Sequence, residues 1–336
     1  MSQLFDVAVA GLSSLLGETF LSVLDERQFP VNELFLLGDE GDAGKKFEFR
    51  DHYLKVTLAE SFDFSRVKLL FLLDVPELAA AIGERAAAAG STVIDLSGHF
   101  QGMPGVPLVV PEVNGDIIAS EMGGQIIASP VGAAAPVALV LDALQREAGL
   151  RRLSITVLAP VSWAGRAGVK ELATQTADLL NARPVTTERF AKQSAFNVLP
   201  QVGELTTSGY TSEEETLEFQ LRQLLEIPDI SLGVTALQVP TFFSYGVALH
   251  LEFAGHLSDQ EAVDCLRRTS GVEVLVDEFP TAVTEAIDQD YVYVGRIREA
   301  KPYNSALALW LVFDHTRKGG VTNAIQIGES LLKSYM

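Results

Sequence analysis

The chain has 336 residues, of which 48% are hydrophobic and 21% charged, and a formal net charge of −19. This is the composition of a globular protein, and at about 150 residues per domain its length predicts two domains. An acidic surface repels phosphate backbones and anionic lipids, which argues against nucleic acid and membrane partners. The single cysteine, Cys265, excludes an intrachain disulfide and a zinc site built on several cysteines.

Neither the N-terminus nor the longest apolar run predicts a targeting or membrane-spanning segment. The first six residues, MSQLFD, have no basic residue ahead of their apolar positions and include an acid, unlike a signal peptide. The longest apolar run, residues 128–141, contains two prolines and is shorter than the about 20 residues that cross a bilayer. We therefore expect a cytoplasmic protein.

The first part of the chain alternates short apolar runs, which predict strands, with helical segments. The predicted strands are residues 5–10, 31–38, 67–74 and 91–95, and the predicted helices run from after Gly17 to about Glu26 and from Glu77 to Ala89. Strands that alternate with helices form a parallel sheet covered on both faces. This part is therefore predicted to be a doubly wound α/β domain of the kind that binds nucleotides.

Farther along the chain, the pattern changes to longer, alternating strands with fewer helices. Pro130 and Pro136 flank a segment of small residues, which is expected to lead into a helix that ends at about Arg146. The later strands are predicted at 153–159, 231–240, 246–253, 291–297 and 306–313, and the later helices at 165–180, 212–225, 258–268 and 320–336. This is the pattern of an α+β domain with a large mixed sheet.

A glycine loop follows the first predicted strand. It reads GLSSLLG from Gly11 to Gly17, one residue longer than a G-x-G-x-x-G loop; the outer glycines are present, while Ser14 replaces the middle one and Ser13 precedes it. Such a loop brings backbone N–H groups to a pyrophosphate, and an acid at the end of the second strand, here Asp39, accepts hydrogen bonds from the adenosine ribose. A plain strand-to-helix turn would look similar, so both interpretations remain open at this point.

Several segments, in order and spacing, resemble the aspartate-semialdehyde dehydrogenase family over the whole chain. The C-terminal DHTRKGGVTNAIQIGE, residues 314–329, is the most specific of them. The others are VAVAGLSSLLGETFLSVLDERQFPVNELFLL near the start, TVIDLSGHFQGMPGVPLVVPEVN (92–114), SWAGRAGVKEL (162–172), AFNVLP (195–200) and YVGRIR (293–298). The resemblance implies a dimer with a glyceraldehyde-3-phosphate dehydrogenase-like fold. Residues 1–130 and 318–336 would form a Rossmann-type dinucleotide-binding domain, and residues 131–317 a catalytic-type dimerisation domain.

The resemblance also implies a chemistry whose nucleophile this chain lacks. Family members use a Cys thiolate, a His acid/base and NADPH to interconvert aspartyl phosphate and aspartate semialdehyde through a thioester. Their Asn-Pro-Asn-Cys segment corresponds to residues 129–132, where Pro130 is kept and Gly132 stands at the nucleophile position. A family Gln falls on Ala159 and the catalytic His on Tyr245.

The cations that bind substrate in the family are also replaced. The Arg that holds the substrate carboxylate corresponds to Gln238, the Arg that binds phosphate to Gln101, and a Lys to Thr216. A site that binds two anions would then lack the charges that compensate them. The resemblance therefore predicts a catalytically degraded, dimeric binding or regulatory protein.

Replacement chemistry and a relic without any ligand are the alternatives. Ser129 and Ser162 lie near the former site but need a base, which the family supplies at the position of Tyr245. Cys265 is expected to be a packed core thiol. The histidines His99, His250, His256 and His315 show no metal-ligand spacing. With another base, the protein would be an NAD(P)-dependent oxidoreductase acting on an aldehyde or acyl phosphate in amino-acid biosynthesis.

The cofactor prediction is weak NAD binding, with NADP disfavoured. Asn323 matches a family residue near the nicotinamide amide, although it could simply be a helix residue facing solvent. Residues 38–42, GDEGD, would present three carboxylates to the 2′-phosphate of NADP, whereas Asp39 can accept from the free 2′-hydroxyl of NAD. Ser14 would crowd the pyrophosphate turn. The partner expected is a second copy of the chain.

Overall fold

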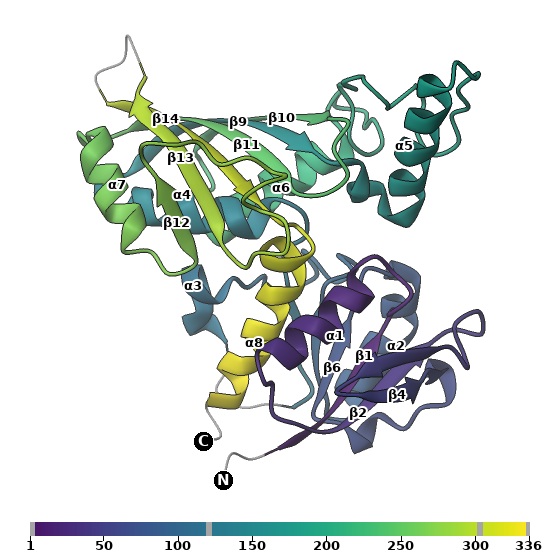
Figure 1. The fold of residues 1–336 in the computed structure, drawn as a ribbon. Coiled ribbons are helices and arrows are strands. Elements are labelled where there is room, and N and C mark those ends of the chain that lie inside the picture. Colours follow the sequence, from purple (N-terminus) through teal and green to yellow (C-terminus); the bar gives the residue numbers. More distant parts are fainter. Residues whose placement is uncertain (1–3, 119–122, 301–304, 334–336) are drawn as a thin grey trace. The chain divides into compact units, whose positions relative to one another are not determined.

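The computed structural model describes residues 4–118, 123–300 and 305–333. The chain divides into two compact units, one formed by residues 1–131 with 319–336 and the other by residues 132–318. Each unit is built on its own six-stranded sheet (Figure 1). The first unit therefore contains both the N-terminal and the C-terminal segments of the chain.

The first unit contains an all-parallel sheet of strand order β5-β2-β1-β6-β7-β8. Its strands are β1 (Phe5–Ala10), β2 (Val31–Gly38), β5 (Thr57–Leu58), β6 (Leu69–Leu72), β7 (Thr92–Asp95) and β8 (Ile126–Ala128), and its helices are α1 (Leu16–Glu26), α2 (Pro76–Ala88), α3 (Pro111–Asn114) and α8 (Thr322–Lys333). Short 3-10 turns occur at Ala59–Ser61, Phe64–Arg66 and Gly115–Ile117. The doubly wound sheet predicted from the alternating pattern is thus confirmed.

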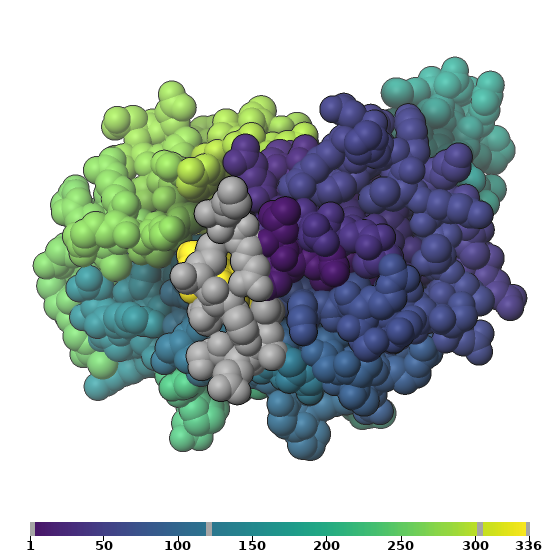
Figure 2. All heavy atoms as spheres, turned by 90° about the horizontal axis from the view of Figure 1, so that it is seen from below, coloured from purple at the N-terminus to yellow at the C-terminus, as the bar shows by residue number. Residues whose placement is uncertain are grey.

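The C-terminal helix completes the core of this unit. Ile325, Ile327 and Leu331 of α8 are fully buried in the same cluster as Phe20 of α1 and Phe71 of β6. The rings of Phe20 and Phe71 lie 4.9 Å apart. Figure 2 shows the N-terminal segments of the unit, coloured purple to blue, as one continuous surface. Because α8 contributes buried apolar side chains to this core, the stability of the first unit depends on this helix.

The second unit contains a mixed sheet of order β10-β9-β11-β14-β13-β12. The β10/β9 and β12/β13 pairs are parallel and the other three pairs are antiparallel. Its strands are β9 (Leu150–Ala159), β10 (Ser231–Gln238), β11 (Tyr245–Phe253), β12 (Val272–Leu275), β13 (Val292–Glu299) and β14 (Ala306–Phe313). The large mixed sheet expected from the alternating strands is confirmed.

Helices cover one face of this sheet. Figure 1 shows α4 (Ala134–Ala148), α6 (Ser212–Leu224) and α7 (Asp259–Arg267) on that side, while α5 (Gly165–Leu180) lies at one end, after the 3-10 turn η4 (Val161–Ala164). Capping boxes fix the starts of α6 and α7: the hydroxyl of Thr211 accepts from the Glu214 N–H, and that of Ser258 accepts from the Glu261 N–H. The opposite face carries partly exposed residues such as Thr156, Ala248 and Trp310, which pair across neighbouring strands.

Several elements of the structure differ from the sequence prediction. The hairpin of β3 (Lys46–Phe49) and β4 (His52–Lys55) was not predicted, because its turn uses Arg50 and Asp51 at positive φ instead of glycine. The strand predicted over 67–74 is shorter in the structure, where β6 covers only Leu69–Leu72, and the short strands β5, β8 and β12 were not predicted. The C-terminal helix begins at Thr322 after a π-helical turn, Arg317–Val321, and residues 334–336 of its predicted range lie outside the described residues. Within the described ranges, every helix is too short or too polar to cross a membrane.

Candidate functional site

Gly132 stands where the resemblance places the nucleophile, two residues before α4 begins. Its φ is +66°, a left-handed conformation that favours glycine, and a Cβ built there would have no heavy atom within 4 Å. The position is therefore open to a side chain in space but strained in backbone conformation. With no side chain at all, it can form no acyl intermediate.

In the first unit, Ser129 is held by two amides and is fully buried. Gln101 donates from Nε2 to the Ser129 carbonyl at 3.1 Å, and Asn323 donates from Nδ2 to the Ser129 Oγ at 2.8 Å. Asn323 also donates to the Val109 carbonyl at 3.0 Å. Both N–H groups of the Asn323 amide are thus used, while its buried Oδ1 has no partner within the described residues. Asn323 is therefore a buried residue, so the interpretation of it as a solvent-facing helix residue is wrong.

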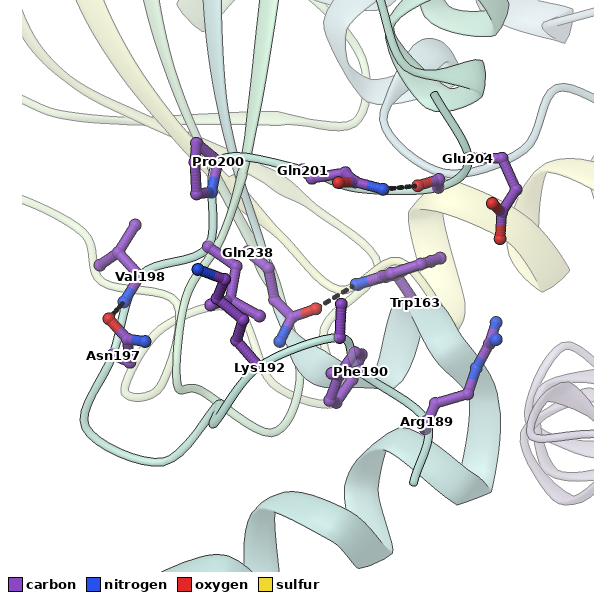
Figure 3. Close-up of a pocket in the computed structure, with 13 residues that line it drawn as sticks. Trp163, Arg189, Phe190, Lys192, Asn197, Val198, Pro200, Gln201, Glu204 and Gln238 are labelled. Atoms are coloured by element: carbon purple, nitrogen blue, oxygen red, sulfur yellow. Dashed lines mark hydrogen bonds between the residues drawn. The ribbon is translucent and has the colours of Figure 1, made fainter. Parts of the chain in front are cut away.

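In the second unit, Ala159 and Gln238 lie side by side as the last residues of β9 and β10. The Gln238 amide is 1% exposed; its Oε1 accepts from the Trp163 indole Nε1 at 3.1 Å and its Nε2 donates to the Ser194 Oγ at 2.9 Å. Figure 3 shows the Trp163 bond. A neutral, hydrogen-bonded amide therefore occupies the position of the carboxylate-binding Arg.

Tyr245, at the position of the catalytic His, is a packed aromatic residue. It is buried and stacks on Phe313, with ring centroids 5.7 Å apart and planes at 7°. The His315 ring lies 5.2 Å away on β14's C-terminal side. A phenol is poorly suited to move protons at neutral pH, because its usual pKa is near 10.

Sequence reasoning missed the base closest to Ser162. The Ser162 Oγ lies 3.3 Å from the His315 Nε2, across 153 residues of chain, so a hydroxyl and an imidazole do meet in this unit. Desolvation by burial, opposed by the nearby Asp314 carboxylate, lowers the pKa of His315 to about 4. His315 is therefore neutral at pH 7, and its buried Nδ1 has no partner within the described residues. No local motif could have revealed this pair.

The remaining candidates are structural or isolated. Thr216 is half-buried on α6. The Cys265 thiol contacts the Ala143 carbonyl at 3.5 Å, and burial together with the Glu147 charge raises its pKa, as expected for a packed thiol and not a nucleophile. The described residues contain no group of three or more His, Cys, Asp or Glu that could hold a metal ion.

The glycine loop forms a tight turn between β1 and α1. Gly11 has φ +91°, and the Ser14 N–H donates to the Gly11 carbonyl at 3.1 Å. A Cβ on Gly17 would lie 1.9 Å from the Leu12 carbonyl oxygen, so no larger residue fits there. The two outer glycines thus have the turn and close-packing roles that a dinucleotide loop requires of them.

A cation lies among the carboxylates that follow β2. Lys45 Nζ lies 2.6 Å from the Asp42 carboxylate and donates to the Ser13 Oγ at 3.3 Å. Burial opposes ionisation of Asp42, but hydrogen bonds from Lys45 and Ser13 outweigh it and lower the pKa of this carboxyl. Asp39, which is exposed, accepts from the Asp42 N–H at 3.0 Å. Lys45 therefore offsets part of the negative charge of the three carboxylates on which the prediction of NAD over NADP rested.

Comparisons with known proteins agree over both units. Residues 6–121 match the model of the semialdehyde dehydrogenase NAD binding domain, and residues 141–318 match that of the semialdehyde dehydrogenase dimerisation domain. The chain is 40% identical over 336 residues to aspartate-semialdehyde dehydrogenase 2 of Vibrio cholerae, covering 100% of both chains. It belongs to the aspartate-semialdehyde dehydrogenase family.

Two further relatives of this family bear on the fold and the site. The crystal structure of aspartate semialdehyde dehydrogenase II complexed with ASA from Vibrio cholerae is similar over 100% of both chains, with a TM-score of 0.96 and 39% identity. The USG-1 protein homolog of Pseudomonas aeruginosa is also 39% identical over 100% of both chains. The family and the two-domain fold predicted from the sequence are confirmed.

Proposed function

We propose that this protein is a member of the aspartate-semialdehyde dehydrogenase family that lacks the family's thioester chemistry and acts as a dimeric, dinucleotide-binding protein in the cytoplasm. The observation that carries the proposal is Gly132, which offers no nucleophile at the start of α4. The only cysteine of the chain, Cys265, is packed against the Ala143 carbonyl on another helix. Neither residue can form a thioester with a substrate.

The surroundings of the former site support the same conclusion. Tyr245 is stacked on Phe313 and cannot relay a proton at neutral pH. Gln238 is neutral, buried and tied to Trp163 and Ser194. A substrate with a carboxylate and a phosphate would therefore lose both charge compensation and acid–base assistance.

A direct assay tests this proposal. Purified protein is incubated with aspartate semialdehyde, phosphate and either NAD or NADP, and reduced cofactor is followed at its absorbance maximum. We expect no phosphate-dependent signal above a no-enzyme control. The Vibrio cholerae relative, assayed in parallel, verifies the substrates. Turnover that depends on phosphate would contradict the proposal.

The proposed cofactor is NAD, bound weakly. The turn at Gly11, the close approach at Gly17 and the free Oδ1 of Asn323 support a dinucleotide, because that oxygen can accept from a carboxamide N–H. Exposed Asp39 and Glu40 favour a 2′-hydroxyl over a 2′-phosphate, although Lys45 reduces this preference. Thermal shifts with NAD and NADP at matched concentrations test the choice, since a ligand that binds the folded state raises the melting temperature. A larger shift with NADP would reverse the assignment.

The proposed assembly is a symmetric homodimer through the open face of the second sheet. That face carries a row of small and apolar side chains, among them Thr156, Leu158, Leu237, Ala248 and Trp310, with strand neighbours in register. An interface of more than about 2,000 Å² would bury them. Light scattering at micromolar concentration should give twice the chain mass, and a monomer mass would refute the assembly.

A second function is supported by the Ser162–His315 pair. A hydroxyl 3.3 Å from a neutral imidazole could serve an NAD(P)-dependent oxidoreductase that handles an aldehyde or acyl phosphate without a thiol. The chain would then oxidise such substrates after thiol blocking but not after Ser162→Ala. Activity of this kind, absent from the variant, would favour the second function over the first.

A further inference from the structure

We infer that the second unit holds a binding site for a small organic anion with a planar apolar body, in a cavity between η4, residues 189–204 and the end of β10. The cavity has a volume of about 570 Å³ and lies entirely in residues 132–318. Cavities of about 300–1,000 Å³ are typical of small-molecule sites. This inference concerns a ligand other than the dinucleotide and goes beyond the proposed function.

The walls of the cavity are suited to a flat ring. Trp163 and Phe190 line it (Figure 3), with ring centroids 6.2 Å apart and planes at 46°. Leu199 adds an aliphatic surface. Phe190 and Leu199 are buried in a small core cluster with Val161 and Leu172, so this wall is fixed by packing. A ring placed against Trp163 would gain contact area without displacing these side chains.

The charge of the lining is positive in a chain that is strongly acidic. Arg189 and Lys192 line the cavity, and Glu204 is the only acid that does so among the residues described. The Arg189 guanidinium lies 5.6 Å over the Trp163 ring, which fixes its place at the wall. Both cationic side chains are exposed, and neither forms an ion pair within the described residues. The cavity therefore attracts anions.

The base of the cavity offers one polar group that selects among ligands. Gln238 is 1% exposed and lines the cavity. Its Nε2 carries two hydrogens, and the Ser194 Oγ accepts one of them at 2.9 Å. The other hydrogen has no acceptor within the described residues. A buried donor without a partner is costly, so a ligand oxygen placed there would be favoured over an apolar group.

Together these groups specify an aromatic carboxylate better than other small molecules. The ring would lie against Trp163 and Phe190, and the carboxylate would accept from the cations and the Gln238 amide. An aliphatic dicarboxylate would leave the aromatic wall empty, and a neutral ring would gain nothing from the two exposed cations. A second copy of the chain could instead cover the opening, and the experiment distinguishes that occupant.

The probe is 4-(trifluoromethyl)benzoate, with its neutral amide as the matched control, observed by fluorine NMR line broadening with the full-length protein. For a ligand of this size we expect a Kd of about 1 mM for the acid, and binding of the amide at least about tenfold weaker. The double variant Arg189→Gln with Lys192→Gln should weaken binding of the acid about tenfold. Lys170→Gln, an exposed lysine on α5 outside this cavity, should leave it unchanged.

Tryptophan emission locates the site independently. The chain has two tryptophans, and Trp163 lines the cavity while Trp310 lies on β14. The acid should change the emission of the wild type but not that of Trp163→Phe. Equal binding of acid and amide, or unchanged binding by the double variant, would overturn the inference. Binding lost as the protein associates at higher concentration would also overturn it, because a second copy would then fill the cavity.

Discussion

The two units of the chain differ in the kind of residue found at their predicted functional positions. In the first unit, Gly11, Gly17 and Asn323 keep the backbone turn, the close approach and the buried amide that a dinucleotide site uses. In the second unit, Tyr245 and Gln238 have become packed, hydrogen-bonded residues. Glycines that shape a cofactor site through the backbone also shape the fold, so replacing them lowers the stability of the unit. A catalytic side chain can be replaced without that cost.

The largest expected effect tests whether the second unit has lost its chemistry at several positions. Gly132→Cys alone should remain inactive, because Tyr245 cannot act as the base and three cations are absent. Each lost charge-assisted hydrogen bond costs about 1.5–3 kcal/mol, so turnover should stay several orders of magnitude below that of an active family member. A cysteine at this position would also have to keep the backbone φ near +66°, which strains any residue with a Cβ.

Stepwise restoration measures this loss. Adding Tyr245→His, and then Gln238→Arg, Gln101→Arg and Thr216→Lys, to Gly132→Cys should raise phosphate-dependent turnover only in the later combinations. The matching set with Gly132→Ser serves as the control for folding and substrate binding. Substantial activity of Gly132→Cys by itself would show that the base and the cations are supplied elsewhere.

The next effect concerns the backbone on which the first unit depends. Gly17→Ala should destabilise this unit by about 3 kcal/mol or more, because the new Cβ would meet the Leu12 carbonyl at 1.9 Å. Gly233→Ala in β10, where a Cβ has no atom within 4 Å, is the control and should change stability little. Urea unfolding by circular dichroism and by tryptophan emission separates the units, since both tryptophans belong to the second. A larger shift in emission than in dichroism would contradict the assignment.

The sequence predicted the fold well wherever a signal is local. Residues 165–180 and 306–313 were predicted with the bounds that α5 and β14 have, because their hydrophobic spacing is regular and they end at clear breaks. The β3–β4 hairpin was missed because Arg50 and Asp51 form its turn in place of the usual glycine or asparagine. Local patterns thus predicted elements, and failed where an unusual residue makes a turn.

The candidate site was predictable only in part, and the reason is distance along the chain. The positions Gly132, Tyr245 and Gln238 followed from a family resemblance. Their new partners did not, because Phe313, Trp163 and Ser194 are far from them in sequence. Lys45 is different, because its ion pair with Asp42 spans only three residues and was open to sequence reasoning; only its bond to Ser13, across 32 residues, was not. Contacts of this kind require the fold.

A smaller effect comes from the titration of His315 in the second unit. Its pKa is about 4 in the folded protein and about 6.5 when unfolded, so the unfolded chain binds more protons between these values. The contribution of His315 to the free energy of unfolding should have its full value above pH 6.5 and decrease by roughly 1–3 kcal/mol as the pH falls toward 4. His315→Gln should remove this part of the pH dependence, as measured by urea unfolding followed through tryptophan emission. Exposed His250→Gln is the control, and the same pH profile in both variants would refute the role of His315.

The smallest effect addresses the cofactor preference of the first unit. Lys45 is exposed and pairs with Asp42, so Lys45→Gln removes one positive charge and leaves the Asp42 carboxylate unpaired beside Ser13. An exposed pair of this kind contributes about 0.2–1 kcal/mol, which corresponds to a change of roughly 1.4- to fivefold in affinity. The ratio of NADP to NAD dissociation constants should therefore rise by about that factor, because the 2′-phosphate is repelled more strongly. Asp42→Asn should move the ratio the other way, and Lys68→Gln, an exposed lysine just before β6 at the opposite end of the sheet, is a charge-matched control. The shift should shrink at high salt, since the charges are exposed. A ratio that does not respond to either variant would mean that the turn after β2 does not face the adenosine ribose, and the expected similarity of the first unit to a working dinucleotide site would fail at that position.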